Sequence, residues 1–218
     1  MTSLHEQQQK ATNFSWLAPF YDTLGAIAFN GNLHRSQAHL LAHYPPQLDR
    51  VLIIGGGTGK FLIELLKKVT VNKLIYLDVS PGMIRQAQKK VAKIFPQQTS
   101  IEFICGSLQD IPELEYDLII THYFLDCFPE KEFIETSQVL KGKLAIDGYW
   151  SMVDFYTTHS ASRSKKMVVK ALYKFFQLTC RLNCQDLANF DPWFEQNLEV
   201  IEQQNFCRGL LKASLYKN

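Results

Sequence analysis

Short apolar runs, each followed by a segment with helical periodicity, recur along most of this 218-residue chain. We expect strands at about 51–54, 73–78, 101–106, 116–121 and 143–153. Helical periodicity is found at about 59–69, 81–94, 129–140 and 161–182. Strands that are apolar throughout are typical of sheets covered on both faces. The alternation therefore predicts an α/β fold with a doubly wound, mostly parallel sheet and helices on both faces.

The C-terminal part changes this pattern. A looser stretch is expected around 190–193, and two strand-like runs follow at about 197–202 and 207–216. A short turn at 203–206 joins them, which predicts an antiparallel hairpin at one edge of the sheet. The hairpin brings the predicted sheet to seven strands.

The N-terminal 44 residues are expected to be a helical extension, with helices near 3–17 and 31–43. An aromatic segment that includes Pro19 and Tyr21 separates the two helices, because proline breaks or opens a helix. This extension is interpreted either as packed on the core or as a lid that closes on a ligand. Residues 45–218 form the second predicted unit, with a helical substrate cover inserted at about 156–195.

The most informative segment is Val51–Phe61, where an apolar strand runs directly into a cluster of glycines. The sequence motif of the phosphate-binding loop in nucleotide hydrolases does not match here. Ile54 stands where that motif requires glycine, and Phe61 stands where it requires a serine or threonine hydroxyl. The dinucleotide fingerprint fits weakly, since Lys60 or Leu62 occupies its last small position. A third pattern, Gly-x-Gly-x-Gly after a buried strand, fits Gly55, Gly57 and Gly59.

In this motif, and over about 45–218, the chain resembles the class I S-adenosylmethionine-dependent methyltransferases with their Rossmann-like fold. The resemblance implies that Asp78 accepts hydrogen bonds from both ribose hydroxyls of S-adenosylmethionine, and that the turns at 80–83 and 106–108 contact the adenine. The implied cofactor-binding residues are Gly55, Gly56, Gly57, Gly59, Asp78, Val79, Ser80, Met83, Gly106, Ser107, Leu108, Thr121 and His122. The chain departs from the family at Ile53 and Ser107, where an acidic residue is common.

The residues after the fourth strand are expected to reach the methyl acceptor. His122, Tyr123 and Tyr21 are the candidate catalytic residues, and a histidine that titrates near neutrality would suit a general base. Asp126 and Asp154 are further candidates. The Asp/Asn-Pro-Pro-aromatic motif of enzymes that methylate nucleic-acid amino groups is replaced by Thr121–Phe124. We therefore expect a small-molecule or lipid-like acceptor and a monomer or homodimer.

Composition narrows the function further. With 23 basic and 21 acidic residues the net charge is +2, which gives no general case for nucleic acid. A stripe of basic residues at 163–181 is interpreted as a solvated helix face or as a peripheral membrane contact. No run of apolar residues predicts a membrane span.

The five cysteines, an odd number, favour reduced thiols and a cytoplasmic location. Cys180 and Cys184 are interpreted as packing residues, so no metal site is predicted. Two alternatives stay open: an NAD(P)-binding oxidoreductase, and a non-catalytic cofactor-binding module of the same fold.

Overall fold

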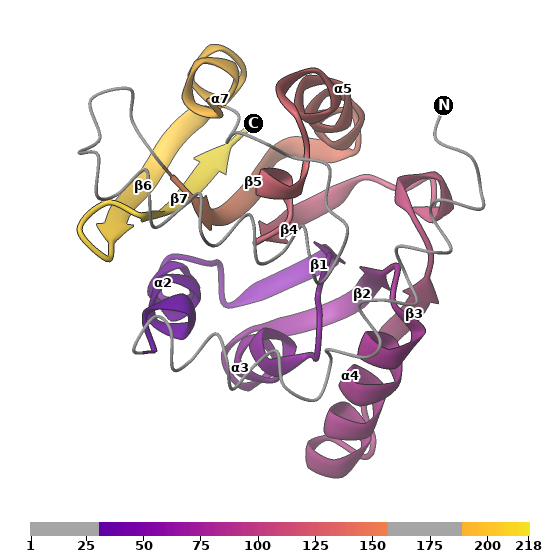
Figure 1. Ribbon diagram of the computed structural model, residues 1–218. Helices are drawn as coiled ribbons and strands as arrows, with labels where there is room; N and C mark the ends of the chain where they lie inside the picture. Colours follow the sequence, from indigo (N-terminus) through magenta and orange to yellow (C-terminus); the bar gives the residue numbers. More distant parts are fainter. Residues whose placement is uncertain (1–30, 157–188) are drawn as a thin grey trace.

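Seven strands form one sheet in the order β3-β2-β1-β4-β5-β7-β6 in the computed structural model, which describes residues 31–156 and 189–218 (Figure 1). The strands are β1 (Gln47–Ile54), β2 (Thr70–Asp78), β3 (Ile101–Cys105), β4 (Tyr116–His122), β5 (Leu144–Phe155), β6 (Glu199–Phe206) and β7 (Leu211–Lys217). Strands β1 to β5 are parallel, whereas β7 pairs antiparallel with both β5 and β6. The predicted seven-stranded sheet with its C-terminal hairpin is confirmed.

Helices cover both faces of this sheet (Figure 1). They are α2 (Asn32–Leu41), α3 (Lys60–Lys68), α4 (Pro81–Ile94), α5 (Glu130–Lys141) and α7 (Asp191–Asn197). Helices α2, α3 and α4 share one apolar cluster with the sheet, and α5 and α7 share a second cluster on the other face. None of these described helices combines the length and apolar composition needed to cross a membrane.

Local sequence signals explain where α4 begins. Ser80 has an extended backbone, and its hydroxyl accepts a hydrogen bond from the Met83 amide at 3.3 Å. Pro81 follows as the first helical residue, where its missing N–H costs nothing. The observed helix, Pro81–Ile94, confirms the predicted span of 81–94. Its start could be predicted because the N-cap residue and the proline are adjacent in the sequence.

Two expectations near the C-terminus are wrong. The stretch around 190–193 is not loose but begins α7, because Pro192 suits a first helical turn and Phe194 stacks on Tyr216 with ring centroids 4.4 Å apart. The hairpin turn lies after Phe206 and not at 203–206. Cys207 and Arg208 adopt positive φ of 51° and 57° there, and Gly209 follows with 85°.

Several expectations lie outside the described residues. They are the helices at 3–17 and 161–182, Tyr21, the basic stripe and Cys180 with Cys184. The division into an extension at 1–44, a domain at 45–218 and a cover at about 156–195 stays a prediction.

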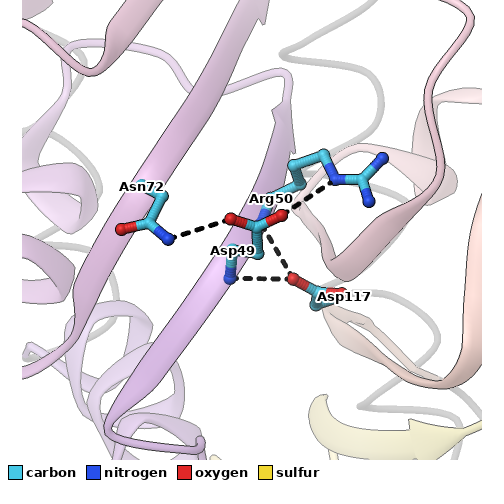
Figure 2. A network of polar contacts seen from close by, with 4 residues as sticks. All are labelled: Asp49, Arg50, Asn72 and Asp117. Atoms are coloured by element: carbon cyan, nitrogen blue, oxygen red, sulfur yellow. Dashed lines mark hydrogen bonds and ion pairs between the residues drawn. The ribbon is translucent and has the colours of Figure 1, made fainter.

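A polar network ties the amino ends of β1, β2 and β4 together (Figure 2). The β1–β4 pairing begins at Val51 and Leu118, so the amides before it need other acceptors. One oxygen of Asp117 accepts from the Asp49 and Arg50 amides, each at 2.8 Å. This network lies at the amino ends of the strands, whereas the glycine loop lies at their carboxyl ends.

Candidate functional site

The loop between β1 and α3 is shaped by alternate glycines. Gly55, Gly57 and Gly59 have φ of 64°, 65° and 79°, a region that other residues enter only with strain. The amides of Gly55 and Gly56 both point to the Leu77 carbonyl of β2, at 2.9 and 3.4 Å. The Gly-x-Gly-x-Gly spacing thus matches the positions at which the backbone must turn left-handed.

The same glycines differ in what surrounds them. A Cβ on Gly56 would lie 2.2 Å from the Tyr76 ring, and one on Gly59 would lie 2.8 Å from Ala87 of α4. A Cβ on Gly57 would meet nothing within 4 Å. Gly56 and Gly59 are therefore required by packing, whereas Gly57 borders the open space in which a ligand fits.

Asp78 ends β2 directly beside this loop. Its carboxylate is 8% exposed and accepts hydrogen bonds at 2.8 Å from the Gly57 amide and from the Ser80 amide, one on each oxygen. Burial raises the pKa of this carboxyl group, and the two amide hydrogen bonds oppose that shift. Each carboxylate oxygen keeps a further lone pair, so Asp78 can accept two hydroxyl groups of a ligand.

Near this carboxylate, the remaining predicted cofactor residues divide into exposed and buried groups. Val79 is 43% exposed beside Asp78, whereas Met83 is only 3% exposed inside α4. Because Met83 is almost fully buried, a ligand can touch its side chain only where the small exposed part reaches the surface. Thr121 points away from the pocket, because its hydroxyl accepts a 2.8 Å hydrogen bond from the buried Trp150 indole.

The turn after β3 contains a residue that the sequence analysis missed. Asp110 accepts hydrogen bonds from the Ser107 amide at 2.8 Å and from the Ser107 hydroxyl at 3.2 Å, and it packs against Gly106. Asp110, the last residue of the turn η1 (Leu108–Asp110), thus places a carboxylate beside Ser107. The Ser-x-x-Asp spacing of a capping box was the signal that could have revealed it.

His122 lies at the end of β4, 6% exposed, in the wall of a pocket beneath the glycine loop. The pocket is lined by Gln37, Ile53, Ile54, Gly55, Gly56, Phe61, Leu62, Tyr76, Ile120 and His122. The Tyr44 hydroxyl donates to the Ser151 oxygen, which lies 2.9 Å from Nε2 of His122. Nε2 of His122 and the Ser151 hydroxyl are thus within hydrogen-bond distance of each other.

This arrangement changes the predicted role of His122. Nδ1 is buried and has no hydrogen-bond partner among the described residues. Burial lowers the pKa of the imidazole to about 3, so the expectation of titration near neutrality is wrong. His122 is therefore a poor general base near neutral pH.

Acidification is expected to destabilise the fold through His122. An unfolded histidine takes up a proton below its ordinary pKa of 6.5, whereas folded His122 stays neutral to about pH 3. The unfolded state therefore binds more protons, and between pH 7 and pH 5 this residue removes about 2 kcal/mol of stability.

The measurement is urea unfolding of the wild-type protein and of His122→Gln at both pH values. Raised carboxyl pKa values at Asp126 and Asp154 act in the opposite sense, but they are common to both proteins. The variant should lose about 2 kcal/mol less on acidification. An equal loss in both proteins would mean that His122 titrates normally.

Tyr123 is used in packing α2 against the site. Its backbone has a positive φ of 56°, and its hydroxyl lies 2.8 Å from the Ser36 hydroxyl and donates to the Leu33 carbonyl at 3.1 Å. The residue thus connects the end of β4 to the helix that contributes Gln37 to the pocket. These contacts hold α2 in place against the end of β4.

Asp126, in the turn η2 (Leu125–Cys127) that follows β4, and Asp154, near the end of β5, form a buried carboxyl pair. Burial raises the pKa of Asp126 to about 6, and burial together with the Asp126 charge raises the pKa of Asp154 well above its ordinary value. Asp154 also accepts a hydrogen bond from the Phe124 amide at 3.0 Å. Close to neutral pH such a pair exchanges a proton more readily than His122.

Comparisons with known proteins agree with this geometry. Residues 51–148 match a family model described as a methyltransferase domain. The chain is 24% identical to the carboxy-S-adenosyl-L-methionine synthase of Nautilia profundicola, across 85% of the chain and 86% of that protein. It is 28% identical to a malonyl-[acyl-carrier protein] O-methyltransferase of Ilyobacter polytropus, across 50% of the chain but only 39% of that protein.

Among solved structures, the N-methyltransferase NodS of Bradyrhizobium japonicum with bound S-adenosyl-L-homocysteine has the same fold. The TM-score is 0.70 at 15% identity, with 96% of this chain and 98% of NodS covered.

Proposed function

We propose that the chain is a class I S-adenosylmethionine-dependent methyltransferase, and that it transfers a methyl group to a small-molecule or lipid-like acceptor. The observation that carries the proposal is the pairing of Asp78 with the open side of Gly57 at the carboxyl ends of two parallel strands. In open α/β sheets, ligands bind at this edge. Bound there, S-adenosylmethionine supplies an electrophilic methyl group on a sulfonium ion.

We assign the binding roles from the polar groups around the loop. Asp78 accepts the two ribose hydroxyls through its remaining lone pairs, and Gly57 leaves the room for them. Asp110, held by Ser107, offers a carboxylate beside the adenine turn, which is the acceptor that an exocyclic amine needs. The serine at position 107 therefore does not weaken the case for adenine.

We assign the pocket below the loop to the amino-acid end of the same ligand. Ile53 lines it and cannot supply the acidic group that the family often has at this position. Gln37, Tyr76 and His122 are the residues in its lining that carry polar side-chain atoms. We assign recognition of the charged groups at this end of the ligand to these polar side chains.

Proton removal, where the acceptor requires it, is assigned to the Asp126–Asp154 pair. Methyl transfer itself depends mainly on positioning and on exclusion of water. A base contributes only when the acceptor loses a proton, and a carboxyl group with a pKa of about 6 suits that task near neutral pH.

The acceptor class follows from the sequence interpretation and from the name of the O-methyltransferase relative. The synthase relative supports a second candidate, in which the cofactor itself is modified, because its alignment covers most of both chains. A nicotinamide cofactor is disfavoured by the glycine spacing. A cytoplasmic location is part of the proposal, in keeping with the free thiols of Cys105 and Cys207.

Isothermal titration with S-adenosylmethionine and S-adenosylhomocysteine tests the binding step. We expect both ligands to bind with one site per chain, and NADH, the control ligand, to give no heat. A folded protein that binds neither sulfur ligand would contradict the proposal.

Mass spectrometry then separates the candidate reactions. Formation of S-adenosylhomocysteine in the presence of an acceptor panel supports methyl transfer, and a mass increase of the cofactor itself supports the second candidate. Tight binding with neither product would favour a non-catalytic module.

A further inference from the structure

Two histidines and a glutamate meet where α2 lies beside the β6–β7 hairpin, at the edge of the sheet (Figure 1). Nε2 of His39 lies 3.0 Å from one carboxylate oxygen of Glu202, and Nε2 of His43 lies 3.9 Å from the other. The ligand atoms of the three residues all lie within 4.8 Å of one another. We infer that His39, His43 and Glu202 form a binding site for a divalent transition metal ion, with Zn²⁺ as the best fit.

The spacing along the chain suits this chemistry. His39 lies in the last turn of α2, and His43 follows two residues after the helix ends at Leu41; their ring centroids are 5.1 Å apart. Two histidines at this spacing with a carboxylate from another element are a recurring zinc-ligand set, and three protein ligands leave a fourth position for water.

Hydrogen bonds orient the ligands. Nδ1 of His43 lies 3.2 Å from the His39 carbonyl and must carry the proton to donate to it, which leaves the Nε2 lone pair free to face Glu202. Metal-binding histidines are commonly fixed in this way.

The distances require only small movements. Ligand atoms bound to one tetrahedral Zn²⁺ at about 2.0–2.1 Å lie roughly 3.3 Å apart. The observed 3.0 and 3.9 Å are close to this value, and the three side chains are 25–36% exposed, so they can adjust. The register of β6 against β7 shifts between Val200 and Glu202, an irregularity of the kind that re-aims a side chain.

A metal ion at this site would join α2 to the edge strand β6. Helix α2 also provides Gln37 to the pocket and holds Tyr123 through Ser36 and Leu33. The expected role is to fix this helix on the sheet, and the inference is independent of the proposed methyl transfer.

The test is isothermal titration of the full-length protein with Zn²⁺, followed by the visible spectrum of the Co²⁺-loaded protein. We expect one equivalent to bind and a Co²⁺ spectrum without thiolate charge-transfer bands. Glu202→Gln and His43→Ala should each weaken binding at least about 100-fold. The melting temperature of the wild-type protein should rise by several degrees with Zn²⁺, and that of the two variants should not.

Two control variants exclude other origins of binding. Glu199→Gln removes the same charge from the same strand outside the ligand set and should bind Zn²⁺ like the wild-type protein. The double variant Cys180→Ser/Cys184→Ser removes the two cysteines whose spacing in the sequence could also suit a metal. It should bind Zn²⁺ like the wild-type protein. No binding at about 100 µM Zn²⁺, or unchanged binding by Glu202→Gln and His43→Ala, would overturn the inference and leave an ion pair between His39 and Glu202.

Discussion

Replacement of Asp78 by asparagine is expected to weaken binding of S-adenosylhomocysteine about 1,000-fold. Each hydrogen bond from a ribose hydroxyl to an ionised carboxylate contributes roughly 2 kcal/mol, and the substitution removes the charge that strengthens both. The new amide group also faces a backbone donor, because Asp78 accepts the Gly57 amide on one oxygen and the Ser80 amide on the other. Isothermal titration measures the loss directly.

Asp117→Asn is the matched control for this experiment. Asp117 also accepts two backbone amides at 2.8 Å, from Asp49 and Arg50, but it lies at the opposite edge of the sheet (Figure 2). The control should bind S-adenosylhomocysteine within about threefold of the wild-type protein. Comparable weakening by both variants would show that the loss at Asp78 reflects a general disturbance of the sheet and not a ligand contact.

Features decided by neighbouring residues could be predicted from the sequence. The start of α4 depends on Ser80 and Pro81, and the glycine loop depends on alternate residues that need positive φ. The hairpin turn was misplaced because Cys207 and Arg208 take left-handed conformations that their side chains do not favour. The helix α7 was missed because its stability comes from packing against residues of β7.

The residues of the site also divide into those that local sequence reveals and those that depend on tertiary packing. Asp78 stands at the end of an apolar strand, and this position together with the family resemblance made it a candidate. The low pKa of His122 depends on burial, and the raised pKa values of Asp126 and Asp154 depend on burial and on how close the two carboxyl groups lie. His39 and Glu202 are 163 residues apart, so no local pattern could have brought them together.

Replacement of Gly59 by alanine is expected to destabilise the fold by about 4 kcal/mol. The added Cβ would lie 2.8 Å from both the Cα and the Cβ of Ala87, so the backbone of α4 must move away from α3. Overpacking of this kind costs roughly 1–3 kcal/mol. A φ of 79° at the N-cap of α3 adds about 1–2 kcal/mol for a residue with a side chain.

Gly57→Ala separates these two contributions. Gly57 has a φ of 65°, close to that of Gly59, but its Cβ would meet nothing within 4 Å. It should therefore lose only the backbone term of about 1–2 kcal/mol in urea unfolding, while its methyl group enters the space assigned to the cofactor. We expect Gly57→Ala to impair binding of S-adenosylhomocysteine in a protein that remains folded at 25 °C. Equal destabilisation by the two alanines would mean that α3 and α4 can separate without cost, and that backbone conformation alone requires glycine at position 59.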